Sequence, residues 1–129
     1  MPSDVEHQQK YAECRRLLDG PPAMSGLSEP WAATMAFYAA AHLVERLAAD
    51  EGLHHIRHTG NPSRNAYLLW HPTHSAIAGD FMALFSASMV ARYESLARFA
   101  AAYPSGVTQS QLIDVNLVAI EQYLRTALP

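Results

Sequence analysis

A chain of 129 residues that is 50% apolar can build one compact core, so we expect residues 1–129 to form a single domain. The formal net charge of -3 provides no overall attraction for phosphate backbones, so contact with nucleic acid would need a local basic patch. Cys14 is the single cysteine, which excludes an internal disulfide, and the apolar run over residues 31–44 is too short to cross a bilayer. We therefore expect a cytoplasmic protein without a membrane segment.

The first two predicted helices cover residues 3–18 and 28–50, and Gly52 ends the second. The second helix is rich in alanine, which lets other helices approach closely and predicts burial on several sides. Tyr38, His42 and Glu45 share one face of it. We interpret these three as a buried polar network that fixes the helix register, with support of a catalytic site as the alternative. Glu45 is expected to pair with an arginine of another helix, either Arg64 or Arg92.

The loop "EGLHHIRHTG" that follows concentrates Arg57 and three histidines, His54, His55 and His58. Such a loop is a candidate anion-binding patch, and Arg57 and His58 join Tyr38, His42 and Glu45 as candidate binding residues. Three imidazoles are also able to complete a catalytic metal sphere. Because the spacing matches no strong metal motif, we expect no metal and no other cofactor, and a metal-dependent hydrolase is the third alternative.

The third predicted helix covers residues 62–70, and Pro72 places His71 at or just past its end. Arg64 and His71 are seven residues apart, nearly two helical turns, so both side chains can serve one site. Cleavage of RNA by its 2′-hydroxyl needs a proton acceptor, which histidine provides, and a cation for the phosphate, which arginine provides. Asn65 could orient either group. The alternative is a structural Arg64 and a solvated His71.

The fourth predicted helix covers residues 75–102, and the fifth opens at Thr108. In the fourth, the residues expected to face inward are Ile77, Phe81, Leu84, Met89 and Leu96. The sequence "TQSQ" predicts a capping box, in which Thr108 and Gln111 each satisfy the other's backbone N–H group. No segment alternates as a strand would, so the fold class is all-α, a single-domain bundle of four to five helices.

The block "SEPWAATMAFYAAAHLVERLAADEGLHHIRHTGNPSRNAYL", together with "ARY" and "TQSQLIDV" further on, resembles small prokaryotic HEPN-like (higher eukaryotes and prokaryotes nucleotide-binding) helical proteins. The resemblance covers about residues 10–126. It implies a helical bundle that is commonly dimeric and is found in toxin–antitoxin, nucleotidyltransferase-paired or other defence settings. HEPN ribonucleases carry an arginine, a short spacer and a histidine, which map onto Arg64, Asn65 and His71. Pro72 departs from the family, whose catalytic histidine lies inside a continuous helix, so His58 or His42 are alternatives.

Our leading hypothesis is a homodimeric, metal-independent endoribonuclease of toxin or defence type, with Arg64, His71 and Asn65 as its catalytic residues. The alternative is a non-catalytic HEPN-like module that binds a nucleotide, RNA or a protein partner. A nucleotidyltransferase or an antitoxin would be such a partner.

Overall fold

The computed structural model describes residues 4–19, 29–52, 61–104 and 107–128. Within these ranges every regular element is a helix, which confirms the all-α fold class. The elements are α1 (Asp4–Asp19), α3 (Glu29–Asp50), α4 (Asn61–Trp70), η2 (His74–Ile77), α5 (Ala78–Tyr93), α6 (Leu96–Ala102), η3 (Thr108–Leu117) and α7 (Val118–Ala127). η2 is a 3₁₀ turn and η3 is π-helical, so the number of helices in the described ranges is slightly above the four to five expected. None of these helices combines the length and the apolar content that a membrane span requires.

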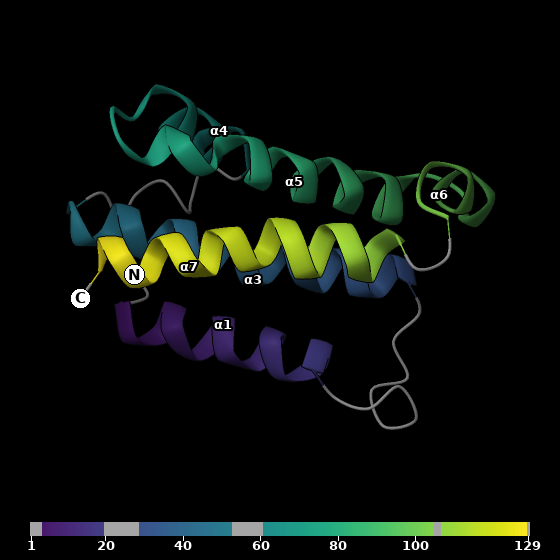
Figure 1. Cartoon of the computed structure of the whole chain (residues 1–129), viewed down its shortest axis with the longest axis horizontal. Helices are drawn as coiled ribbons and strands as arrows, with labels where there is room; N and C mark the ends of the chain where they lie inside the picture. Colours follow the sequence, from purple (N-terminus) through teal and green to yellow (C-terminus); the bar gives the residue numbers. More distant parts are fainter. Residues whose placement is uncertain (1–3, 20–28, 53–60, 105–106, 129) are drawn as a thin grey trace.

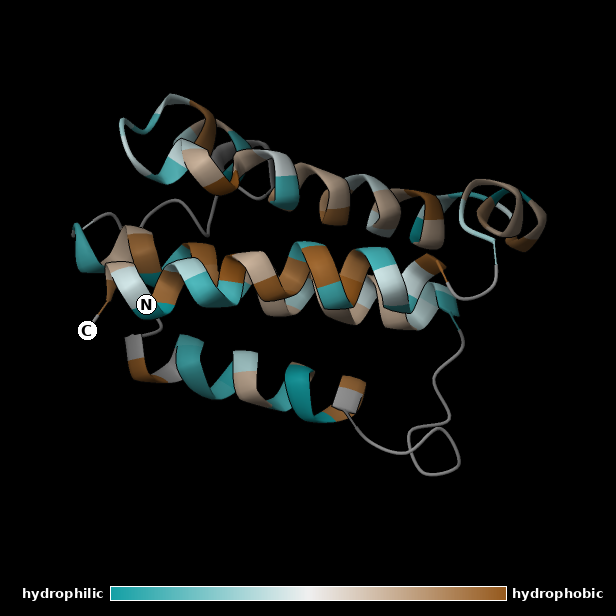
Figure 2. Ribbon diagram, in the orientation of Figure 1, coloured by the Kyte–Doolittle hydropathy of each residue, from teal (hydrophilic) through white to brown (hydrophobic). Residues whose placement is uncertain are grey.

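Helix α3 lies at the centre of the bundle, with α1 on one side, α5 on the other, and η3 and α7 along a third (Figure 1). Its alanines are small enough for these neighbours to pack closely, and Ala33, Ala36, Ala39 and Ala40 are all fully buried. The prediction that this helix is covered on several sides is therefore confirmed. Figure 2 shows hydrophilic bands along the outer helix α1, whereas α5 is largely apolar.

The core is built around large side chains from α3, α5 and the C-terminal helices. Phe37 and Phe81 are fully buried, with ring centroids 5.5 Å apart, and Leu117 and Ile120 close the core from η3 and α7. Of the residues expected to face inward between 75 and 102, the first three, Ile77, Phe81 and Leu84, are buried.

Met89 and Leu96 were wrongly expected to face inward. Met89 lies on an exposed side of α5, and Leu96 lies beyond a break in the predicted helix over residues 75–102. Met89 is 38% exposed and Leu96 is 76% exposed. Helix α5 ends at Tyr93, and Glu94 is extended, with φ -109° and ψ 172°. Ser95 then caps α6, since its hydroxyl accepts the backbone N–H of Arg98 at 3.1 Å. A serine cap starts a new helix axis, which turns Leu96 toward solvent.

The predicted capping box at Thr108 is also wrong. Val107 is already helical, and no side chain caps the start of η3. Thr108 is 2% exposed and its hydroxyl donates to Glu29 Oε2 of α3 at 3.3 Å. A buried hydroxyl needs a partner, and the carboxylate of the neighbouring helix provides it in place of the backbone.

The ends of α3 and α4 position the polar residues described below. Helix α3 ends as predicted, because Gly52 adopts φ +80° and its N–H donates to the carbonyl of Ala49 at 2.9 Å. His71 lies directly after α4, as Pro72 predicts. The C-terminal ends of α3 and α4 therefore bring Glu51 and His71 into contact.

Candidate functional site

Glu45 and Arg64 form a buried ion pair between α3 and α4. Arg64 Nε donates a hydrogen bond of 2.8 Å to Glu45 Oε1, and Nη2 of the same guanidinium contacts the same oxygen. The side chains of Glu45 and Arg64 are 4% and 15% exposed. A carboxylate this buried is costly without a cation, so the pair holds α4 against α3. The expected pairing of Glu45 with an arginine of another helix is confirmed, and Arg64 is the partner.

The second oxygen of Glu45 faces two histidines. Oε2 is 3.1 Å from Nδ1 of His7 and 3.6 Å from Nδ1 of His42. The two Nδ1 atoms are 3.2 Å apart. His42 and Glu45 are three residues apart on α3 and so share a face, whereas His7 comes from α1. Burial by itself raises the pKa of the Glu45 carboxyl, but the interactions with His42 and Arg64 outweigh it, so the pKa is lowered and Glu45 is ionised at neutral pH.

Sequence analysis missed His7. The signal that identifies it is its spacing to Tyr11, Cys14 and Leu18, which follow at steps of four, three and four residues. Those three side chains pack against the core, and His7 on the same stripe is 4% exposed. A histidine on the packed stripe of an otherwise polar helix is therefore expected to have buried polar partners.

A second polar cluster lies where α3, α4, η2 and α7 meet. His71 Nε2 is 3.0 Å from both carboxylate oxygens of Glu51, and the Tyr67 hydroxyl donates to the same carboxylate. His74 stacks on His71 with ring centroids 3.8 Å apart, and its Nδ1 is 2.6 Å from the Tyr123 hydroxyl. Arg64 and His71, which the sequence suggested for one site, therefore contact different carboxylates.

The proton of the His71 ring is fixed by its neighbours. Nδ1 accepts the backbone N–H groups of Thr73 at 3.1 Å and His74 at 3.0 Å. A neutral imidazole whose Nδ1 accepts hydrogen bonds carries its proton on Nε2, and here Nε2 faces Glu51. Among the described residues, His71 is thus a donor to a carboxylate rather than a ring with an available Nε2 lone pair.

The pKa values of Glu51 and His74 in this cluster are both lowered. Burial by itself raises the pKa of Glu51, but the hydrogen bonds from Tyr67 and His71 and the charges of the two histidines outweigh it, so the pKa is lowered. The pKa of His74 is lowered because the ring is partly buried and lies beside His71. Both shifts favour an ionised Glu51 next to a neutral His74 near neutral pH.

Tyr38 interacts with Arg92 rather than with the Glu45 network. Arg92 Nη1 donates to the Tyr38 hydroxyl at 3.3 Å, and its guanidinium lies 5.8 Å from the centre of the buried Phe37 ring. Arg92 therefore interacts with aromatic side chains and is not the arginine that pairs with Glu45. The prediction of one buried network formed by Tyr38, His42 and Glu45 is therefore wrong for Tyr38, which is 36% exposed and contacts Arg92, whereas His42 and Glu45 interact with each other.

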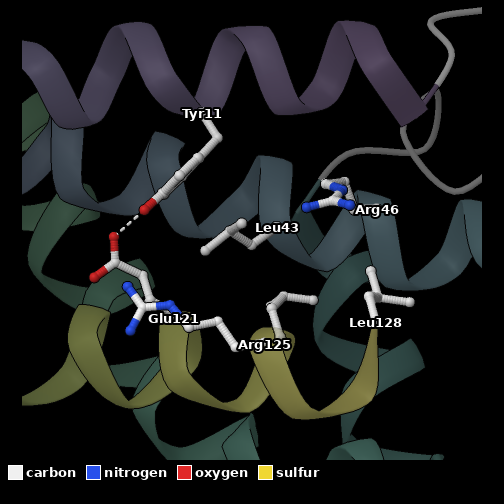
Figure 3. A pocket seen from close by; sticks show the side chains of 7 residues that line it. Tyr11, Leu43, Arg46, Glu121, Arg125 and Leu128 are labelled. Carbon is white, nitrogen blue, oxygen red and sulfur yellow. Dashed lines mark hydrogen bonds between the residues drawn. The ribbon is translucent and has the colours of Figure 1, made fainter.

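A pocket of about 240 Å³ opens between α1, α3 and α7 (Figure 3). It is lined by Tyr11, Leu43, Arg46, Glu121, Leu124, Arg125 and Leu128. The lining combines leucines with the guanidinium groups of Arg46 and Arg125, on neighbouring helices. None of these seven residues was a candidate in the sequence, because their approach depends on how α1 and α7 pack on α3.

The carboxylate in the pocket wall, Glu121, is already paired. It is 7% exposed, its Oε2 is 3.3 Å from Arg15 Nε, and it accepts a hydrogen bond from the Tyr11 hydroxyl. Burial and the neighbouring Glu121 charge raise the pKa of Tyr11, which stays neutral. Arg15 balances Glu121, and Arg46 and Arg125 place two further guanidinium groups in the pocket wall.

The remaining candidate residues from the sequence are Asn65, Arg57 and His58. Asn65 is half-buried, and its amide oxygen is buried with no hydrogen-bond partner in the part of the chain that the structure describes. Arg57 and His58 lie outside the described residues.

Comparison of the chain with models of known protein families, with curated proteins and with solved structures finds no match.

Proposed function

We propose that the protein is a non-catalytic HEPN-like module that binds a nucleotide in the pocket between α1, α3 and α7. The observation that carries this proposal is that Arg46 and Arg125 both line a pocket whose wall also holds leucines and Tyr11. Guanidinium groups bind phosphate through paired hydrogen bonds, and leucine and tyrosine side chains provide contact area for a sugar and a base. In a chain with a net charge of -3, such a site depends on local charge.

The size of the pocket limits the ligand. At about 240 Å³ it lies just below the usual range for small-molecule sites, which suits a single nucleotide better than a dinucleotide or an RNA helix. The buried ion pair between Arg64 and Glu45 supports the non-catalytic assignment, because it gives Arg64 a structural task inside the bundle.

Isothermal titration calorimetry with the four ribonucleoside monophosphates and with inorganic phosphate tests the proposal. We expect binding of at least one monophosphate, with a loss of roughly tenfold or more for Arg46→Gln and for Arg125→Gln, because each removes a charge-assisted hydrogen bond. The matched control is Arg98→Gln on α6, whose side chain is 75% exposed and does not line the pocket. No binding at millimolar nucleotide, or an equal loss in the control, would refute the proposal.

The metal-independent endoribonuclease is the second candidate, and the buried, unpartnered amide oxygen of Asn65 is the observation that favours it. This function needs Arg64 to exchange Glu45 for a phosphate and His71 to leave Glu51. An RNA cleavage assay in EDTA, comparing the wild type with Arg64→Ala and His71→Ala, tests it: cutting that both variants lose supports the nuclease. A homodimer and a nucleotidyltransferase or antitoxin partner are further proposals from the same resemblance, to be tested by sedimentation and by co-purification.

A further inference from the structure

Three possible metal-ligand atoms lie close together between α1 and α3, and hydrogen bonding alone does not explain their arrangement. Nδ1 of His7, Nδ1 of His42 and Oε2 of Glu45 form a triangle with sides of 3.2, 3.1 and 3.6 Å. If both rings carry a proton on Nδ1, the contact between the two nitrogens is repulsive. If one ring carries it, a lone pair of the other ring faces the carboxylate. No placement of the ring protons makes all three contacts favourable, whereas a cation bound to all three atoms does.

The spacing of these atoms suits a transition metal. Two ligands of a tetrahedral ion with bonds of about 2.0 to 2.1 Å stand roughly 3.3 to 3.4 Å apart, which lies within the range of the three sides. Two imidazole nitrogens and one carboxylate oxygen are ligands for zinc, iron, cobalt or nickel, while magnesium and calcium prefer oxygen alone. We propose that His7, His42 and Glu45 form a binding site for zinc or a related divalent transition metal.

Residues around the three ligands hold Glu45 in place and leave the site partly exposed to solvent. Arg64 holds Oε1 of Glu45, which fixes the carboxylate so that Oε2 faces the histidines. His7 and Glu45 are almost fully buried, but the side chain of His42 is 26% exposed, so the fourth position opens on the His42 side and suits a water molecule. The guanidinium near the carboxylate weakens the attraction for a dication, so we expect weaker binding than at structural zinc sites. The ion would link α1 to α3.

The cluster of Glu51, His71 and His74 offers a matched comparison. Its donor atoms also lie close together. However, Nδ1 of His71 accepts two backbone N–H groups, so the Nε2 atom that would bind an ion carries the ring proton. Binding of a metal there would require a ring with no proton on either nitrogen. The proposal therefore assigns the metal to the inner cluster, and it does not depend on the nucleotide-binding function.

Titration of EDTA-treated, dialysed protein with cobalt(II) and zinc(II) tests the proposal. We expect one ion per chain, a visible cobalt absorption band typical of tetrahedral coordination, and a higher melting temperature with zinc. His7→Gln and His42→Gln are expected to lose tenfold or more in affinity, since each removes a ligand. His71→Gln and His74→Gln are expected to keep the affinity of the wild type, as is a variant in which His54, His55 and His58 are all replaced by glutamine.

X-ray absorption of the cobalt-loaded wild-type protein is the second measurement, because a variant of a buried residue such as His7 can fail to fold. Two imidazole ligands and one carboxylate are expected around the ion. The proposal is overturned if no cobalt spectrum develops, if the spectrum survives in folded His7→Gln and His42→Gln, or if the loop-histidine variant abolishes it.

Discussion

Replacing Arg64 by methionine tests how much the buried ion pair contributes to stability. The change keeps most of the side-chain volume but leaves the Glu45 carboxylate, which is 4% exposed, without its cation. Removing one partner of a buried pair typically costs about 3 to 5 kcal/mol. The variant can avoid the charge by protonating Glu45, which costs about 3.7 kcal/mol at pH 7 for a carboxyl of ordinary pKa, and this sets a ceiling. We therefore expect a loss of about 3 to 4 kcal/mol in the free energy of unfolding.

Urea unfolding followed by circular dichroism measures this loss, with EDTA present so that no metal at Glu45 contributes. For a domain of this size the loss corresponds to a melting temperature lower by about 10 to 15 °C. Glu45→Gln and the double variant complete a cycle, in which the double variant should be more stable than the sum of the single losses predicts. Arg98→Met, in an exposed pair with Glu94, is the control and should change little. A loss under about 1 kcal/mol for Arg64→Met, or an equal loss with and without Glu45, would refute the reasoning.

Replacing Gly52 and Gly79 by alanine should change the free energy of unfolding, measured in urea, in opposite directions. Gly52→Ala should lower the free energy of unfolding by about 1 kcal/mol because φ is +80°. Gly79→Ala should raise it by about 0.5 to 1 kcal/mol because Gly79 lies within α5 with no atom near its Cβ position. A loss of stability in both variants would contradict this account. Ala36→Leu should cost about 1 to 3 kcal/mol by overpacking the fully buried face of α3, and an unchanged melting temperature would show that the neighbouring helices can separate. Stability should fall as the pH drops below about 6.5 and again below about 4.5, since the folded pKa values of His74 and Glu51 are lowered and the unfolded chain binds the protons first. His74→Gln should remove the upper step in a pH series of unfolding curves, and Glu51→Gln should reduce the lower one, to which Glu45 also contributes. A series in which both steps persist unchanged would argue against these assignments.

The sequence by itself determined the helices and the properties of their faces. Prolines, glycines and periodicity placed α1, α3 and α4 to within about a residue, because helix ends depend on local backbone chemistry. The alanines of α3 predicted its central place, since small side chains allow close approach. Pro72 placed His71 just after α4 for a local steric reason. The need of Glu45 for a cation also followed from its residue type and its apolar surroundings.

Tertiary structure decided which polar groups meet. Glu45 had two candidate arginines, and only the approach of α4 to α3 selects Arg64, while the packing of α1 adds His7 from 38 residues away. His71 contacts Glu51 because the ends of α3 and α4 converge, which no spacing along one helix predicts. The Thr108 hydroxyl donates to the carboxylate of Glu29 on another helix instead of capping its own helix. Local propensity acts over a few residues, whereas the partner of a buried charge is set by how helices distant in the sequence pack, so the polar clusters and the pocket emerged only from the folded chain.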